Sequence, residues 1–211
     1  MSYRKIFGVG DSHSGNFNGL HPNVQDLQLG PITLYQISDK YRDNIRKDIL
    51  GLFDLNIKEK INTKDILILY CAGEIDIRCN WEKQINQLGK NEDQLIKDVI
   101  DNAFDTLLPL HRPFGFQSIV PAVKHEYIIE EDEDYPVRGS DKDRVRWVKK
   151  ANNYLKQKCI ENDCVFFDIW ESYADKDGHL ILDLSDGGVH VLDKSLVLKQ
   201  LVNSNLFNLG E

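Results

Sequence analysis

The stretch Asp65-Ile-Leu-Ile-Leu-Tyr-Cys-Ala72 is a nearly unbroken run of apolar residues between two polar segments. A strand that is covered by helices on both faces has this composition, because both rows of its side chains are buried. The run therefore predicts a central strand of a parallel sheet and places the chain in the α/β class.

Patterns on both sides of this run extend the prediction. Shorter apolar runs predict four more strands, over residues 5–10, 32–37, 117–123 and 164–170. Apolar residues spaced three and four apart predict amphipathic helices over residues 39–53, 92–110, 141–160 and 192–206. Asp39 and Asp141 each follow a serine and stand where helix N-caps are expected.

The alternation of strands and helices predicts one fold for the whole chain. We expect a single α/β domain over residues 1–211, with a parallel sheet, helices on both faces and right-handed crossovers. A chain of this length can bury a substantial core without disulfides or metals. Because sheets of this type bind ligands beyond the carboxyl ends of their strands, we expect the site in the loops that follow the strands.

The composition is that of a soluble globular protein, with 41% hydrophobic and 28% charged residues. The formal net charge of -8 argues against nucleic acid as the main partner, because affinity for a duplex comes largely from basic side chains. The sequence has no run of about 18 apolar residues that would span a membrane. The polar segment Met1–Lys5 lacks the apolar region of a signal peptide. We therefore expect a cytoplasmic location and no membrane partner; these features do not predict the oligomeric state.

The cysteines and glycines give no sign of a metal or cofactor. Cys71, Cys79, Cys159 and Cys164 form no CxxC pair and no zinc-binding spacing, and we expect no disulfide framework. No GxGxxG or GxxxxGK[ST] pattern follows the first predicted strand, which disfavours a nucleotide-binding or receiver module. We predict no cofactor and no bound metal.

The stretch Gly8-Val-Gly-Asp-Ser-His-Ser14 ends the first predicted strand with glycines and small polar residues. Ser12 would lie at a helix start beyond the strand, where free backbone N–H groups can stabilise an oxyanion. Such a serine becomes a nucleophile only beside a base. The alternative interpretation is a turn in which serine merely caps a helix.

A base is available near the end of the chain, in Leu184-Ser-Asp-Gly-Gly-Val-His190. This segment follows the fifth predicted strand, so it should reach the same edge of the sheet as Ser12. His190 can accept the serine proton while Asp186 orients the imidazole, and Asp183 is a rival for that role.

At these positions the chain resembles the SGNH (GDSL) hydrolases: Gly10-Asp-Ser-His is similar to their GDS block, and Asp186 with His190 to their Asp–His block. The resemblance implies a flavodoxin-like three-layer α/β/α fold with a five-stranded parallel sheet. It also implies Ser12 as nucleophile, His190 as base and Asp186 as the orienting acid. Here one residue more than usual separates Asp186 from His190.

The family's third block differs in this chain. Where members usually have Gly-x-Asn-Asp, this sequence reads Gly73-Glu-Ile-Asp-Ile-Arg78, so Ile75 replaces the asparagine that donates to the oxyanion. The form resembles a subgroup often associated with surface-polysaccharide genes. Arg78, oriented by Glu74, can supply charged donors to an oxyanion or a substrate anion, or the two can form a plain salt bridge. Gly30, before the second predicted strand, best matches the family's second oxyanion glycine, and Gly15 and Gly19 are the nearby alternatives.

These features predict a carboxylic ester hydrolase that removes acetyl or other short acyl groups from a carbohydrate or small metabolite. The same residues could transfer the acyl group to another alcohol, and the loss of the asparagine leaves a non-catalytic carbohydrate or anion binder as the alternative. Residues 126–146 are either a solvated surface loop or a cover over the strand ends.

Overall fold

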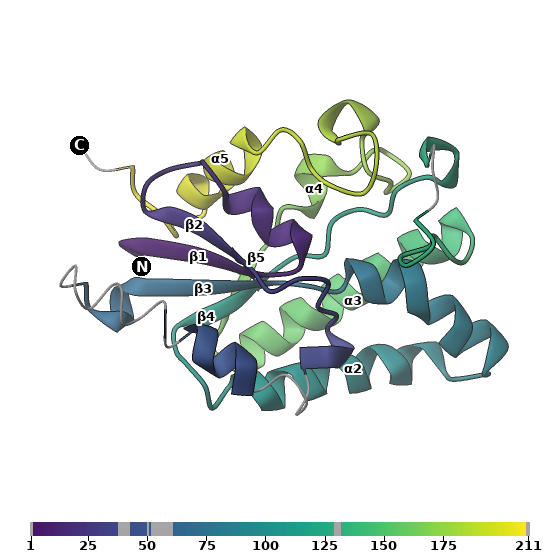
Figure 1. Cartoon of the computed structure of the whole chain (residues 1–211), viewed down its shortest axis with the longest axis horizontal. Coiled ribbons are helices and arrows are strands. Elements are labelled where there is room, and N and C mark those ends of the chain that lie inside the picture. Colours follow the sequence, from purple (N-terminus) through teal and green to yellow (C-terminus); the bar gives the residue numbers. More distant parts are fainter. Residues whose placement is uncertain (1, 38–42, 50, 52–60, 129–131, 210–211) are drawn as a thin grey trace.

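Five parallel strands form one sheet in the order β2-β1-β3-β4-β5 (Figure 1). The computed structural model describes residues 2–37, 43–49, 51, 61–128 and 132–209. The strands are β1 Lys5–Gly10, β2 Val24–Gln28, β3 Ile66–Cys71, β4 Phe114–Gln117 and β5 Val165–Phe167. This all-parallel sheet confirms the predicted α/β class.

The centre of the sheet is the pair β1 and β3, in which every residue is buried. Their ends approach so closely that a Cβ on Gly10 would lie 1.8 Å from the carbonyl oxygen of Cys71. That carbonyl also accepts a 3.0 Å hydrogen bond from the N–H of Asp11. The glycine therefore lets the chain leave β1 directly beside the end of β3.

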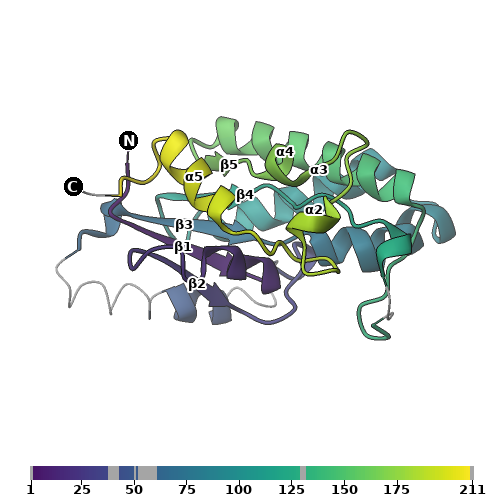
Figure 2. The same ribbon diagram turned by 90° about the horizontal axis from the view of Figure 1, so that it is seen from above.

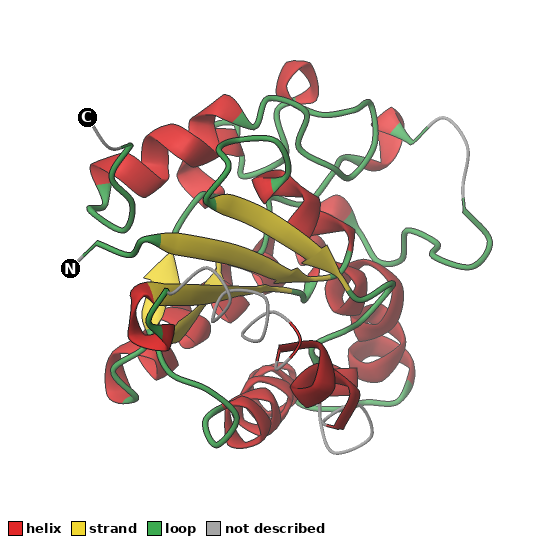
Figure 3. Ribbon diagram, turned by 60° about the vertical axis from the view of Figure 1, so that its left-hand side comes forward, coloured by secondary structure: helices red, strands yellow, loops and turns green. Residues whose placement is uncertain are grey.

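Helices cover both faces of the sheet (Figures 1, 2 and 3). On one face lie α2 (Glu92–Leu107), α3 (Asp141–Glu161) and the helical residues 43–49, packed on Ile66, Ile68 and Tyr70 of β3. On the other lie η1 (Ser12–Phe17), α4 (Trp170–Tyr173) and α5 (Ser195–Asn203), packed on Leu67, Leu69 and Cys71. Alternate residues of one strand thus feed two cores, as the apolar run predicted.

The prediction of a second strand over residues 32–37 is wrong. The strand is β2, whose sequence Val-Gln-Asp-Leu-Gln is mostly polar because it pairs only with β1 at the sheet edge. Ile32, Leu34 and Ile37 are buried, but they belong to a turn that ends in η2 (Tyr35–Ile37). Burial in a packed loop produced the apolar pattern that resembled a strand.

The fourth strand lies before its predicted range, over Phe114–Gln117 instead of 117–123, and the fifth is shorter than predicted and ends earlier. β4 ends at Gln117, and the chain then leaves the ladder: the N–H of Ile119 donates to the Asn152 side chain at 2.8 Å. β5 ends at Phe167, and Trp170 already belongs to α4. Side-chain partners from other segments, which no local pattern encodes, replace the ladder after both strands: Asn152 after β4, and Ser118 after β5, where its hydroxyl accepts from the N–H of Ile169 at 2.9 Å.

The predicted helices exist where the structure describes them, but their ends differ. The predictions over 92–110, 141–160 and 192–206 correspond to α2, α3 and α5, and residues 43–49 and 51 of the predicted 39–53 helix are helical. Ser140, not Asp141, is the N-cap of α3, because its side chain accepts from the N–H of Asp143. Asp39 lies outside the described residues. Along the part of the chain that the structure describes, no helix is long and apolar enough to cross a bilayer.

Candidate active site

Ser12 lies immediately beyond β1, on the first residue of η1, and its side chain is exposed. The turn is fixed from within by Asp11, whose carboxylate accepts a 2.9 Å hydrogen bond from the N–H of His13. Ser14, two residues further, is fully buried, and its hydroxyl donates to the carbonyl of Asp11 at 2.8 Å. Of the two serines in this turn, only Ser12 presents its hydroxyl to solvent.

The structure brings Ser12, His190 and Asp186 together. Nε2 of His190 lies 2.8 Å from Oγ of Ser12, and Nδ1 lies 2.9 Å from Oδ2 of Asp186. His190 lies in the loop before α5 and reaches Ser12 at the end of β1, although 178 residues separate the two along the chain. Serine hydroxyl, imidazole and carboxylate are thus within hydrogen-bonding distance in series.

Asp186 is held by more than the imidazole. Its Oδ1 accepts from the N–H groups of Gly188 at 2.9 Å and His190 at 3.3 Å. Partial burial would raise the pKa of Asp186, but the hydrogen bonds from His190 and Gly188 outweigh it and lower that pKa. The carboxylate is therefore charged at neutral pH. The rival Asp183 is exposed, in η7 (Leu182–Leu184), and makes no hydrogen bond to His190 in the described structure.

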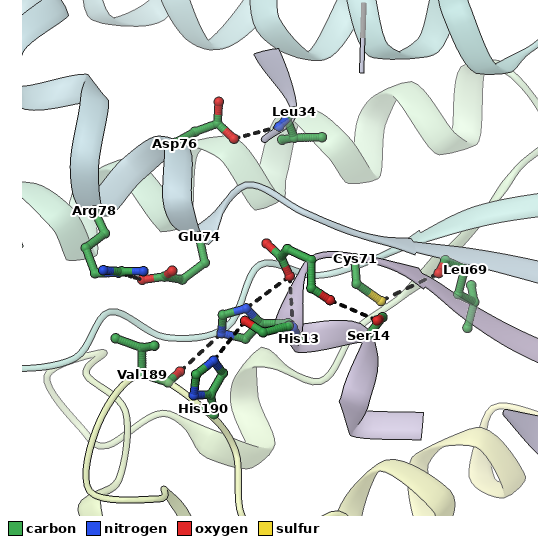
Figure 4. Close-up of polar contacts among 12 residues, drawn as sticks. His13, Ser14, Leu34, Leu69, Cys71, Glu74, Asp76, Arg78, Val189 and His190 are labelled. Atoms are coloured by element: carbon green, nitrogen blue, oxygen red, sulfur yellow. Dashed lines mark hydrogen bonds and ion pairs between the residues drawn. The ribbon is translucent and has the colours of Figure 1, made fainter. Parts of the chain in front are cut away.

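Arg78 donates to two acceptors, of which Figure 4 shows Glu74. Its Nε donates to Oε1 of Glu74 at 2.6 Å, and its Nη1 donates to the backbone carbonyl of Tyr135. The Arg78 carbonyl in turn accepts from the N–H of Arg138 at 2.8 Å. Glu74 and Arg78 thus form the ion pair that both predicted roles require, and both side chains are buried. The contacts to Tyr135 and Arg138 tie the segment before α3 to this side of the site.

Two residues, Gly73 and Asp76, fix the segment between β3 and the wide π-type helix η4 (Asp76–Trp81). Gly73 has φ +113°, and a Cβ there would lie 2.7 Å from the side chain of Ile119, so a larger residue does not fit. Asp76 points to the turn before η2, accepting from the N–H groups of Leu34 at 2.7 Å and Tyr35 at 3.2 Å. Burial raises the pKa of Asp76 to about 7, although these N–H groups favour its charged form. Asp76 therefore fixes the turn that follows Gly30.

Ser12 and His190 open into a cleft with a cavity of about 540 Å³. Its walls are mainly apolar, formed by Pro31, Ile75, Ile128, Val137 and Val189. Polar groups from Gln28, Gly30, Arg78, Asp132, Tyr135 and Asp186 complete the lining. Clefts of this size and composition are typical of sites for small organic ligands. The segment from Asp132 to Val137 forms one wall and is therefore not only a solvated loop.

Gly30 lies after the second strand, whereas the sequence pattern placed it before that strand. Because β2 ends at Gln28, Gly30 follows a strand instead of preceding one. It has φ +80°, and it lines the same cleft as Ser12. It therefore lies at the carboxyl edge of the sheet, where this fold binds its ligands.

A second, more polar cavity of about 300 Å³ adjoins this cleft. Pro31, Ile75 and Tyr135 line both cavities and form the boundary between them. Thr33, Gln36, Asn80 and Asp134 supply its polar groups. Among the residues that the structure describes, no three His, Cys, Asp or Glu side chains are placed to hold a metal ion.

Sequence reasoning missed the contacts that His13 and Tyr135 make in the site. Nε2 of His13 lies 3.2 Å from the carbonyl oxygen of Val189, next to His190. Its place directly after Ser12 was a signal, but its partner is 176 residues away. Tyr135 contributes a backbone carbonyl, for which the sequence carries no signal.

Comparison with known proteins shows similarity of structure and not of sequence. A scan against protein-family models found no match, and a search of curated proteins found no significant one. A proposed acylhydrolase from Bacteroides fragilis superposes with a TM-score of 0.60 at 16% identity, over 95% of this chain and 85% of that one. A GDSL-like lipase from Bacteroides thetaiotaomicron gives 0.58 at 13%, over 95% and 86%.

An acetyl xylan esterase superposes with a TM-score of 0.51 at 14% identity, over 95% of this chain and 98% of that one. All three alignments extend over nearly the whole chain. At these identities the likeness concerns the fold, which agrees with the parallel sheet and its two helical layers. The chain has the five-stranded α/β fold of the GDSL-like (SGNH) hydrolases.

Proposed function

We propose that the protein is a serine hydrolase of carboxylic esters, with Ser12 as nucleophile, His190 as general base and Asp186 as orienting acid. The observation that carries this proposal is the series of two hydrogen bonds, 2.8 Å from Ser12 to His190 and 2.9 Å from His190 to Asp186. Both distances are within hydrogen-bond reach, as required for proton transfer from Ser12 to His190 and for orientation of His190 by Asp186.

The reaction follows from these positions. Nε2 of His190 takes the proton of the Ser12 hydroxyl as Oγ attacks the ester carbonyl, and Asp186 stabilises the imidazolium that forms. His190 then gives that proton to the departing alcohol, which leaves an acyl group on Ser12. A water molecule, deprotonated by the same imidazole, hydrolyses the acyl-enzyme and restores the serine. An alcohol in place of this water would make the protein an acyltransferase.

The negative oxygen of the tetrahedral intermediate needs donors that are already in place. We assign the backbone N–H groups of Ser12 and Gly30 to this role, because both residues line the cleft. Arg78 lines it as well, and its Nη2 has no protein acceptor among the described residues. We propose that Arg78 supplies the donor that Ile75 cannot, with Glu74 holding its orientation and Gly73 giving the backbone room to turn.

The lining of the two cavities supports a substrate class. The cleft of about 540 Å³ must hold both the acyl group and part of the alcohol. This volume therefore suits a short acyl group, which would pack against Ile75 and Val137. The adjoining cavity, with Thr33, Gln36 and Asn80, offers hydrogen bonds to a hydroxyl-rich alcohol. We therefore propose acetyl or other short-acyl esters of a carbohydrate or small polar metabolite.

Replacement of Arg78 tests its assigned role. We expect Arg78→Ala to lower kcat by about 100- to 1000-fold, because an oxyanion donor acts mainly in the transition state. Arg78→Lys should recover only part of this, since lysine keeps the charge but loses the planar fork that contacts Glu74 and Tyr135. The measurement is kcat and KM on one short-acyl ester. A rise in KM at constant kcat would make Arg78 a substrate clamp, and no change in either would make it structural.

Hydrolysis of a chromogenic ester series tests the proposed function. We expect Ser12-dependent release of nitrophenol from acetyl and butyryl esters, slower release from the octanoyl ester, and acetate release from acetylated sugars. Methanol added as a second acceptor would reveal acyl transfer as methyl ester. A folded protein that hydrolyses none of these esters, yet binds an acetylated sugar in calorimetry, would contradict the proposal and favour the binding module.

A further inference from the structure

His13 is a buried imidazole that the reaction described above does not use. It follows Ser12 directly, yet it is only 4% exposed, whereas Ser12 faces solvent. Its ring lies beside that of His190, with 5.2 Å between the ring centroids (Figure 4). A buried polar ring is expected to have hydrogen-bond partners for its nitrogens, and those partners indicate its role beside His190.

Both ring nitrogens of His13 face groups that only accept hydrogen bonds. Nδ1 lies 3.2 Å from Oδ1 of Asp11, and Nε2 lies 3.2 Å from the carbonyl oxygen of Val189. A neutral imidazole carries one N–H and can satisfy only one of these acceptors. The two contacts together therefore require the imidazolium form, paired with the buried carboxylate of Asp11.

The surroundings of His13 favour that charge. Burial alone would lower the pKa of His13, but the charge and hydrogen bond of Asp11, with the charge of Glu74, outweigh burial and raise it to about 9. Asp11 faces the ring from its own turn, Glu74 from the segment after β3, and His190 from the loop before α5. His13 is therefore charged at neutral pH.

The bond from His13 to Val189 reaches the loop that carries the base. The other described hydrogen bonds of residues 186–190 are local, such as the N–H of Asp186 to the carbonyl of His190 at 3.0 Å. Only two described hydrogen bonds join this loop to the turn after β1: Ser12 to His190, and His13 to Val189. Ser12 gives up its proton during the proposed reaction, so its hydrogen bond to His190 is lost at that step. The hydrogen bond from His13 to Val189 can remain throughout the reaction.

We propose that His13 is a positioning residue whose imidazolium clamps the carbonyl of Val189 and thereby holds His190 within reach of Ser12. This role rests on the proposed function of the Ser12–His190 pair. A displacement of a reacting group by about 1 Å can cost about 100-fold in rate, so a single clamp on the adjacent residue has a measurable effect.

The clamp depends on pH in a defined direction. Above a pH of about 9, His13 loses one proton. The remaining proton stays on Nδ1 beside the carboxylate of Asp11, so Nε2 presents a lone pair to the Val189 carbonyl. Two acceptors repel each other, and the clamp opens. The proposal therefore predicts a fall in kcat as pH rises through about 9.

Two amide substitutions separate the clamp from simple packing. In His13→Gln the amide nitrogen can take the place of Nε2 and still donate to Val189, whereas in His13→Asn the shorter amide reaches only the position of Nδ1 beside Asp11. We expect His13→Asn to lower kcat by about 100-fold with little change in KM. We expect His13→Gln to recover most of that loss and to lack the fall above pH 9, with exposed His125→Gln as the unchanged control.

A second measurement makes the test independent of turnover. Nitrogen NMR of the wild-type protein at pH 7 should show both His13 ring nitrogens protonated, and His13→Asn should speed amide exchange at Gly188, Val189 and His190. A neutral His13 at pH 7, or equal kcat and pH profiles for folded His13→Asn and wild type, would overturn the clamp. If the NMR results are as expected but no ester is hydrolysed, the clamp stands and the proposed function fails.

Discussion

Ser12→Ala is expected to lower ester turnover by about four to six orders of magnitude while the protein stays folded, because loss of the nucleophile removes the covalent route. The side chain is exposed, and its only described hydrogen bond is to His190, so its removal leaves the core untouched. The measurement is kcat/KM on a short-acyl chromogenic ester, with thermal unfolding of the same sample.

Ser14→Ala provides the matched control for this substitution. It removes a hydroxyl two residues away, one that is buried and donates to the carbonyl of Asp11. We expect a lower melting temperature but turnover close to that of the wild type. If Ser12→Ala kept more than a tenth of the wild-type turnover, or if Ser14→Ala were the inactive variant, the nucleophile would be misassigned.

His190→Ala is expected to cost nearly as much as Ser12→Ala, because nucleophile and base act as one unit. Combining the two substitutions should add little to either. Asp186→Asn should cost less, since the amide can still contact Nδ1 but no longer stabilises the imidazolium with a full charge. The measurement is again kcat/KM, compared across the single and double variants.

Two substitutions serve as controls for this series. Asp183→Asn changes the exposed rival carboxylate and should behave as wild type, and His125→Ala removes an exposed imidazole outside the cleft. An Asp183→Asn variant less active than Asp186→Asn would mean that the loop before α5 rearranges when substrate binds. Additive effects of Ser12→Ala and His190→Ala would mean that the two residues act independently.

The fold could be predicted from the sequence where burial is periodic or complete. β3 is buried on both faces, so its apolar run is unambiguous, and α2 and α3 show their core faces at regular spacing. The edge strand β2 has one partner and a polar sequence, and nothing local separates it from a loop. Residues 32–37 are the opposite case, an apolar segment that is not a strand. The N–H of Leu34 donates to the carboxylate of Asp76, 42 residues away, instead of to a neighbouring strand.

The reactive residues of the site could be predicted from their side-chain chemistry, but the contacts that hold them in place could not. Ser12, Asp186 and His190 have side chains whose chemistry is visible in the sequence, and the topology of a parallel sheet brings their loops to one edge. The clamp on Val189 and the contact between Arg78 and Tyr135 use backbone carbonyls, which every residue carries. Such contacts depend on the three-dimensional path of the chain.

The most direct test of the central claim is labelling with a serine-directed fluorophosphonate, followed by peptide mapping of the adduct. The account predicts a single adduct on Ser12, formed quickly in the wild type and lost in His190→Ala, because the imidazole must take the proton as Oγ attacks phosphorus. An adduct on Ser14, or no adduct at all on a folded protein, would contradict it.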